Sequence, residues 1–202
     1  MSRKYSLYDI YPKSTDNGYG EEFARKRFNV LLDLQFLSVL DVGSGPCFLH
    51  KWLYDNKIDA EYEAVDIRSE TLDKCKCPVH KTIPLDKQYD LVCLFGTVTY
   101  NVDYATATNK QILISLLQDA LRVSKKYILF TVIKKEGNHP AVFQANRFLY
   151  YSHEEILELL DALNVKNFTI YSDENLDPNE WFVLCKFSET YLGGSSLGLK
   201  II

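Results

Sequence analysis

The feature that most constrains this chain is an alternation of short apolar runs with segments of helical periodicity. Continuous apolar runs are typical of strands that are buried on both faces of a sheet. The predicted strands occupy 36–42, 61–66, 79–83, 89–95 and 127–133, of which 36–42, 89–95 and 127–133 are the apolar runs. Apolar residues at helical spacing occupy 21–34, a segment from Pro46 to about Tyr54, and 108–122. Five alternations of strand and helix predict a parallel sheet between two layers of helices.

The end of the chain departs from this alternation. Ser152 and Glu155 form the capping-box pattern that opens a helix, here to about Leu163. Two more strands are predicted at 165–171 and 181–187. The polar connection between them has no helical pattern, so we expect them to pair antiparallel. The predicted fold class is an α/β three-layer sandwich with a mostly parallel seven-stranded sheet and an antiparallel last strand.

Length and composition fit one such domain. The chain has 202 residues, of which 47% are hydrophobic and 25% charged, as is ordinary for a globular protein. We expect a cap or lid segment with a helix at 1–34, the sandwich itself at 35–188 and a tail at 189–202.

Charge and cysteine usage exclude some classes of protein. The formal net charge is −4, so the chain has no overall basic field for a nucleic acid, although Arg25, Lys26 and Arg27 could form a local basic patch. The N-terminus lacks an apolar signal core, and no apolar run approaches the roughly 20 residues that span a bilayer. Five scattered cysteines predict reduced thiols and a cytoplasmic protein.

The first apolar run ends in a glycine-rich turn, Asp41-Val42-Gly43-Ser44-Gly45-Pro46. In a parallel sheet, ligands bind beyond the carboxyl ends of the strands. The glycines let the backbone approach a ligand, and the next helix directs its first amides at the same space. Asp66 ends the second predicted strand, where a carboxylate can accept both hydroxyls of a ribose. These features predict a nucleoside cofactor, and Phe48 opposes a dinucleotide because it occupies the place of a third glycine.

Over residues 20–188 the chain resembles the class I S-adenosylmethionine (SAM) dependent methyltransferases, which have a Rossmann-like fold. Segments 39–46 and 64–67 resemble their first two motifs. Segments 82–92 and 95–97 resemble the approach to their fourth strand and its end, and 152–156 resembles the helix after their fifth strand.

The resemblance implies a set of cofactor contacts for SAM, or for its product S-adenosylhomocysteine. The first motif would hold the methionine portion, Asp66 the ribose and Ile67 the adenine. The residues that the resemblance implies in the cofactor site are Asp41, Gly43, Ser44, Gly45, Pro46, Asp66, Ile67, Ile83, Phe95, Gly96 and Thr97.

Two features depart from the family pattern. Cys47 stands where many members have a third small residue of the loop. The third strand lacks the acidic residue that often binds the adenine amino group, and has Val79, His80 and Lys81 in its place.

Catalytic and acceptor residues follow less directly, because the sulfonium methyl is already activated and transfer depends on positioning. His139, in the loop after the fifth strand, could take a proton from an acceptor, or could be an ordinary loop histidine. Tyr100 and Asn101 follow the fourth strand and face the expected acceptor position. Arg147 adds a cation to a loop with aromatic residues that could cover the acceptor or pack on the core.

Cys75-x-Cys77-x-x-His80 offers three potential metal ligands. A structural zinc site takes four, usually with Cys-x-x-Cys spacing, and no fourth ligand follows nearby. The sequence therefore favours reduced surface thiols and no metal.

The sequence as a whole predicts a SAM-dependent methyltransferase that modifies an oxygen, nitrogen or carbon atom of a small molecule. The compact domain and the acidic charge favour such an acceptor over tRNA or protein, which stay alternatives. A non-catalytic methyltransferase-fold partner protein is a third possibility, favoured by the missing adenine carboxylate. A nicotinamide oxidoreductase is opposed by Phe48.

Overall fold

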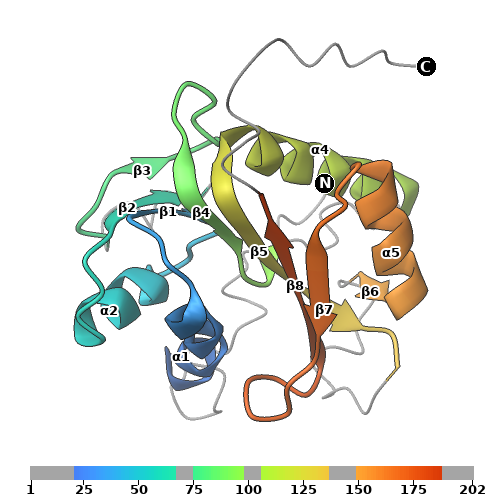
Figure 1. Cartoon of the computed structure of the whole chain (residues 1–202), viewed down its shortest axis with the longest axis horizontal. Coiled ribbons are helices and arrows are strands. Elements are labelled where there is room, and N and C mark those ends of the chain that lie inside the picture. Colours follow the sequence, from blue (N-terminus) through green and yellow to red (C-terminus); the bar gives the residue numbers. More distant parts are fainter. Residues whose placement is uncertain (1–20, 67–74, 98–105, 137–148, 188–202) are drawn as a thin grey trace, which may run out of the picture.

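A computed structural model describes residues 21–66, 75–97, 106–136 and 149–187 of the chain (Figure 1). The helices are α1 (Glu21–Phe28), a 3₁₀ helix (Asn29–Asp33), α2 (Phe48–Asp55), α4 (Thr106–Val123) and α5 (His153–Ala162). The strands are β1 (Ser38–Val42), β2 (Glu61–Val65), β3 (Val79–His80), β4 (Tyr89–Leu94), β5 (Ser124–Lys134), β6 (Tyr150–Tyr151), β7 (Phe168–Tyr171) and β8 (Glu180–Lys186).

The strands form one sheet in the order β3-β2-β1-β4-β5-β8-β7, and the two-residue β6 pairs with β5 outside this path. Strands β1 to β6 pair in parallel, whereas β8 runs antiparallel to both β5 and β7. The predicted parallel sheet with an antiparallel last strand is therefore confirmed. The sheet has eight strands rather than seven, because Tyr150–Tyr151 adds a short strand at the end of the predicted loop.

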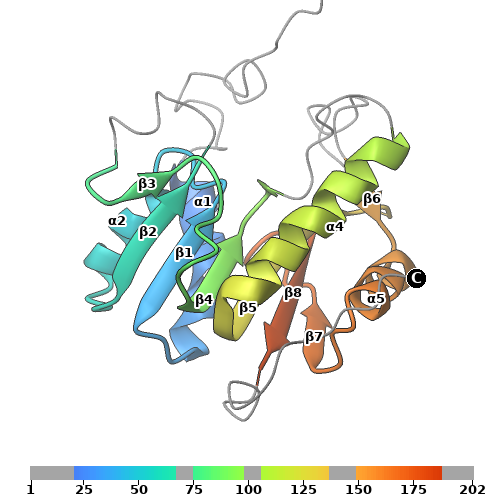
Figure 2. The same ribbon diagram turned by 90° about the horizontal axis from the view of Figure 1, so that it is seen from above.

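Helices cover both faces of the sheet, α1 and α2 on one and α4 and α5 on the other (Figures 1 and 2). Because side chains alternate along a strand, β1 sends Val39 toward α1 and α2, and Leu40 and Val42 toward α4 and α5. By the same alternation, Asp41 lies on the face of Val39. This orientation accounts for its burial.

Helix α4 confirms the helix predicted at 108–122 and extends it by a few residues at the ends. Leu113, Leu117 and Ala120 lie at helical spacing and are buried against the sheet. None of the described helices is long and apolar enough to cross a membrane.

Two predicted helix ends differ in the structure. The helix predicted at 21–34 keeps α geometry to Phe28 and then tightens into the 3₁₀ helix. The segment predicted to begin at Pro46 becomes helical at Phe48, because Cys47 adopts a left-handed conformation with φ 58°. The capping box at α5 is confirmed, since Ser152 and Glu155 bond reciprocally.

A candidate cofactor site at the carboxyl ends of β1 and β2

The turn after β1 is a backbone arch that requires glycine at its first position. Gly43 has φ 77°, and its N–H donates to Val65 O at 2.7 Å. A Cβ atom on Gly43 would lie 2.1 Å from Thr97 Oγ1, too close unless Thr97 or the turn shifts. Thr97 in turn donates to Val42 O at 2.6 Å, so the ends of β1 and β4 are tied together.

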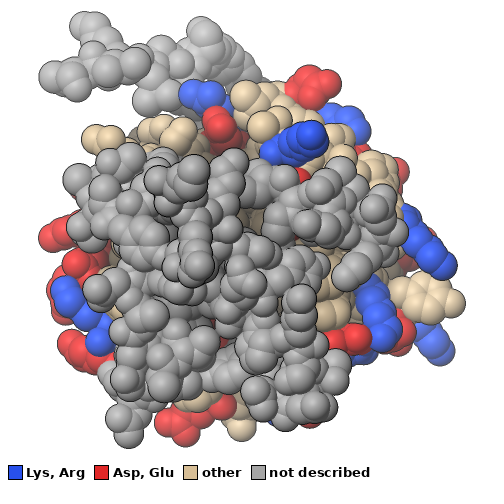
Figure 3. Space-filling view, turned by 180° about the vertical axis from the view of Figure 1, so that it is seen from behind, with Lys and Arg blue, Asp and Glu red and all other residues tan. Residues whose placement is uncertain are grey.

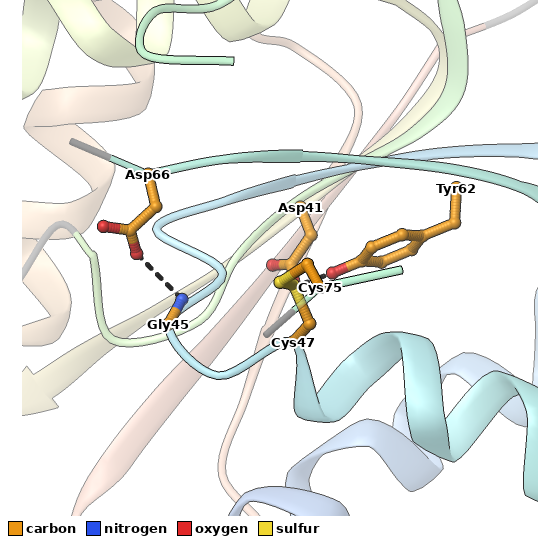
Figure 4. Close-up of a disulfide and its surroundings, with 6 residues drawn as sticks. All are labelled: Asp41, Gly45, Cys47, Tyr62, Asp66 and Cys75. Atoms are coloured by element: carbon orange, nitrogen blue, oxygen red, sulfur yellow. Dashed lines mark hydrogen bonds between the residues drawn. A yellow bond between two sulfur atoms is a disulfide. The ribbon is translucent and has the colours of Figure 1, made fainter. Parts of the chain in front are cut away.

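The second glycine of the turn meets the carboxylate that follows β2. Gly45 N–H donates to Asp66 Oδ2 at 2.9 Å, and Asp66 is 5% exposed (Figure 4). Ser44 N–H donates to Val65 O at 3.2 Å, while the buried Ser44 Oγ has no hydrogen-bond partner among the described residues. The structure thus brings the predicted loop and Asp66 together, and leaves one buried hydroxyl there without a partner.

Asp41 lies near the end of β1, just before the same loop. Its Oδ2 accepts a 2.6 Å hydrogen bond from Tyr62 Oη, and the side chain is 4% exposed (Figure 4). Burial raises the pKa of Asp41 to about 7; the Tyr62 bond lowers it, and the charge of Asp66 raises it further. Asp41 therefore changes its charge near neutral pH.

Tyr62 is a site residue that the sequence interpretation missed. It lies on β2, where Ala64 is the register partner of Asp41, so the period of two puts Tyr62 and Asp41 on one face. Parallel pairing of the two predicted strands, together with this alternation, was a signal that could have identified the pair.

The end of β4 lies next to the glycine turn, as the sequence predicted. Gly96 has φ 69°, and its N–H donates to Thr131 Oγ1 at 2.9 Å. The ring of Phe95 packs edge-on against Phe28, with 5.0 Å between ring centroids. Phe95 and Gly96 thus contact α1 and β5, whereas Thr97 contacts the end of β1 beside the glycine turn.

Comparisons with known proteins bear on what this geometry is. No protein-family model and no curated protein matches the sequence. Solved structures do match. A SAM dependent methyltransferase from Archaeoglobus fulgidus aligns with TM-score 0.61 and 15% identity, over 83% of this chain and 95% of that one. One from Aquifex aeolicus aligns with TM-score 0.61 and 20% identity, over 91% and 99%.

The chain has the class I methyltransferase fold. A third match is the magnesium protoporphyrin IX methyltransferase of Synechocystis PCC 6803 with bound SAH, with TM-score 0.54 and 12% identity over 83% of this chain and 82% of that one. Other matched structures are longer, and this chain covers 56%, 62% and 57% of three of them.

In this methyltransferase fold, each cation of the predicted basic patch of α1 has an acidic partner. Arg25 bonds Glu21 at 3.1 Å and Asp55 at 2.7 Å, and Lys26 lies 4.0 Å from Glu22. Arg27 is buried and donates to both carboxylate oxygens of Glu180, at 3.0 and 3.1 Å. Arg27 is therefore not part of a surface patch. Helical spacing indicates the partners Glu21 and Glu22, whereas Glu180 lies 153 positions from Arg27 and could not be predicted in this way.

Glu63, on β2, is the centre of an ion cluster that includes His80 on β3. His80 Nε2 lies 2.6 Å from Glu63 Oε2, Lys87 Nζ 2.8 Å from Oε1, and Tyr89 Oη donates to Oε2 at 2.8 Å. Ile83, which was predicted to contact the cofactor, is buried in the core cluster that includes Val65.

The sulfur atoms beside the site correct another expectation. Cys47, directly after the glycine turn, forms a disulfide with Cys75, which precedes β3 (Figure 4). These two cysteines are therefore not the reduced thiols that the sequence predicted. Cys77, Cys93 and Cys185 are free.

Several predicted residues lie outside the described ranges. They are Ile67, Tyr100, Asn101, His139 and Arg147. Their cofactor, acceptor and catalytic roles stay predictions.

Proposed function

We propose that this chain binds SAM over the turn between β1 and α2 and transfers its methyl group to a small-molecule acceptor. One observation carries the proposal. The arched turn at Gly43 and Gly45 lies between two buried carboxylates, Asp41 and Asp66, at the carboxyl ends of adjacent parallel strands. This is the edge of an α/β sheet where ligands bind.

The residues of this edge fit the parts of such a cofactor. Positive φ at both glycines exposes backbone without Cβ atoms, as close approach of a ligand requires. The partnerless Ser44 Oγ offers a hydrogen bond that no described protein group uses. Asp66 suits the ribose hydroxyls, and Asp41 suits the ammonium group of the methionine portion, directly or through water.

The protein's contribution to the reaction would be positioning and control of charge. SAM supplies a methyl group that is already activated for displacement. Asp66, held by Gly45 N–H, would fix the nucleoside end. Asp41 would lose its proton as an ammonium group approaches, because a nearby positive charge lowers the pKa of a carboxyl. Tyr62 Oη donates to Asp41 and would keep the carboxylate oriented.

Charge on the described surface supports a small acceptor over a nucleic acid. All three cations of the predicted α1 patch pair with acidic residues. In Figure 3, described Lys and Arg side chains are interspersed with Asp and Glu around the margin of the visible face. Among the matched structures, one is named as a magnesium protoporphyrin IX methyltransferase, whose name specifies a small molecule. Tyr100, Asn101, His139 and Arg147 are the proposed acceptor and proton-transfer residues, and a cytoplasmic location is proposed with them.

Calorimetric titration of the purified protein with SAM and S-adenosylhomocysteine tests the cofactor site. Asp66→Ala should weaken binding by about 10- to 100-fold, the worth of a charged hydrogen bond. Asp161→Ala is the matched control, because Asp161 lies on the exposed face of α5 and pairs only with Lys166 among the described residues. Unchanged affinity in a folded Asp66→Ala variant would contradict the placement of the ribose.

The wild-type protein decides between the enzyme and a non-catalytic relative. If the folded protein binds neither compound, the partner-protein alternative replaces the proposal. If it binds, incubation with methyl-labelled SAM and separate pools of small metabolites, RNA and protein should place the label in the small-molecule fraction. Label in RNA or protein would overturn the acceptor class and leave the cofactor site standing.

A further inference from the structure

Three cysteines gather beside the glycine turn from two separate parts of the chain. The sulfur atoms of Cys47, Cys75 and Cys77 all lie within 4.8 Å of one another. Cys47 is the residue before α2, whereas Cys75 and Cys77 precede β3. A disulfide joins Cys47 to Cys75, and Cys77 is left as a third, free sulfur at the same place.

Once the disulfide is reduced, the three sulfur atoms lie close enough together to bind one metal ion. Zinc binds thiolates at about 2.3 Å in tetrahedral geometry, which puts the sulfur atoms roughly 3.8 Å apart. The Cys-x-Cys segment alone supplies two ligands, and the fold brings Cys47 in as the third. His80, the third ligand that the sequence suggested, instead pairs with Glu63.

The cluster lies partly at the protein surface. Cys47 is buried, while Cys75 and Cys77 are half-buried, so that an ion could enter from their side and keep a water molecule as a fourth ligand.

We propose that, in the reduced protein, Cys47, Cys75 and Cys77 bind one zinc ion through three thiolates. Two molecules of a thiol reductant, or one dithiol, supply two electrons and two protons to the Cys47–Cys75 disulfide and become a disulfide themselves. Binding of the ion then releases the protons of the three thiols. Oxidation of Cys47 and Cys75 removes two ligands, so that the disulfide and the metal exclude each other.

The site would anchor the glycine turn in either redox state. Cys47 follows Gly45 by two residues, and Cys75 belongs to the segment between β2 and β3. The disulfide ties these segments under oxidising conditions, and the three-thiolate site would tie the same segments in a reducing compartment. This inference concerns the sulfur cluster alone and does not depend on which cofactor the turn binds.

Metal titration of the whole protein in both redox states tests the proposal. The protein is reduced with a phosphine, freed of metal with a chelator and titrated without oxygen with Co²⁺, then Zn²⁺. We expect one equivalent of Co²⁺ with thiolate-to-metal charge-transfer absorption, its displacement by Zn²⁺, and a higher melting temperature of the reduced protein with zinc. The oxidised protein should show none of these. Absence of the absorption in reduced protein, or equal binding in oxidised protein, overturns the proposal.

Cysteine variants identify the ligands. Cys77→Ser leaves the Cys47–Cys75 disulfide possible and removes one thiolate, so reduced Cys77→Ser should bind Zn²⁺ at least about tenfold more weakly. Cys185→Ala is the control, because Cys185 is a free thiol on β8 outside the cluster, and one equivalent should still bind. Circular dichroism checks that each variant is folded. Unchanged zinc affinity in folded Cys77→Ser, or its loss in folded Cys185→Ala, would contradict the assignment.

Discussion

Buried polar groups at the two ends of the central strands differ in how fully they are hydrogen-bonded within the protein. At the amino ends, Asp90 Oδ2 accepts from Leu37 N–H at 2.9 Å and from Lys126 Nζ at 3.3 Å, and Asp90 N–H donates to Ser38 Oγ at 2.9 Å. At the carboxyl ends, Asp41 has a single hydrogen-bond donor among the described residues, Tyr62.

The difference separates stability from binding. A buried group whose bonding capacity is satisfied within the protein stabilises the fold, whereas one that lacks partners destabilises it by its desolvation. The hydrogen bonds of Asp90 at the amino ends therefore stabilise the pairing of β1 with β4. The carboxyl ends hold a raised pKa at Asp41 and a partnerless Ser44 Oγ, which a ligand would relieve.

The pH dependence of stability gives the largest expected effect. Asp41 has an ordinary pKa of 3.8 when unfolded and about 7 when folded. The folded state thus holds the Asp41 proton more tightly, so the contribution of Asp41 to wild-type stability falls as pH rises from about 4 to about 7. Asp41→Asn removes this titration, so its stability relative to the wild type should rise by about 4 kcal/mol between pH 4 and pH 8. Urea unfolding at each pH measures it.

The control is Asp161→Asn on the exposed face of α5, which should follow the wild-type pH curve closely. Parallel plots of unfolding free energy against pH for Asp41→Asn and the wild type would show that folding does not raise the pKa of Asp41. SAM affinity should rise with pH through about 7 in the wild type and lose this dependence in Asp41→Asn.

The glycine turn should give the next largest effect, about 3 kcal/mol for Gly43→Ala. A left-handed residue with a Cβ costs about 1–2 kcal/mol, and overlap with Thr97 adds a similar amount. Gly96→Ala is the matched control, with φ 69° but its nearest neighbour, Arg27 Nη1, at 3.8 Å, so it should show the first cost alone. Urea unfolding measures both.

A second change sharpens the test of the turn. Thr97→Ala removes the two side-chain atoms nearest to the added Cβ, at 2.1 and 2.8 Å. The double variant should therefore recover part of the stability that Gly43→Ala loses. Strictly additive losses in the double-mutant cycle would argue against the overlap.

At the amino ends, Asp90→Ala should lower the free energy of unfolding by about 2 kcal/mol and leave ligand binding unchanged. Asp90→Ala leaves Leu37 N–H without its acceptor and Lys126 without its partner. Asp90→Asn keeps an acceptor and should lose roughly half as much. Denaturant unfolding gives the loss, and calorimetry with SAM should show wild-type affinity in both variants. Weakened SAM binding would break the proposed separation between the two ends.

The carboxyl ends were more predictable from the sequence than the rest. Glycines occur in a strand-to-helix turn because the backbone there takes positive φ angles. The alternation of strands and helices independently places Asp66 at the end of the neighbouring strand. The turn and Asp66 were accordingly predicted together, and the structure brings them together.

Contacts between elements distant in sequence were not predictable in this way. The Cys47–Cys75 disulfide spans 28 positions and depends on how α2 and the segment before β3 approach each other. The Arg27–Glu180 pair joins the first described helix to the last strand. Local patterns carry periodicity and turn chemistry, but partner choice across the sheet depends on packing. The contacts that were missed consequently join elements around the site, whereas the residues that form its loop were predicted.

The smallest stability effect belongs to Ser44→Ala, and it separates the two ends most sharply. Because the buried Ser44 Oγ has no partner among the described residues, removing it loses no hydrogen bond, and stability should change by less than about 1 kcal/mol. Ser38→Ala is its counterpart at the amino end and should destabilise by about 1 kcal/mol, since Ser38 Oγ accepts from Asp90 N–H.

Ligand binding should reverse this order. Ser44→Ala removes a hydroxyl that has no partner among the described residues and that SAM is proposed to engage, so SAM affinity should fall about tenfold, whereas Ser38→Ala should bind as the wild type does. Paired urea unfolding and calorimetry on the two variants give four values. If Ser44→Ala lost stability and kept its affinity for SAM, the Ser44 hydroxyl would stabilise the fold rather than bind the ligand. The difference between the two ends of β1 would then depend on Asp41 alone.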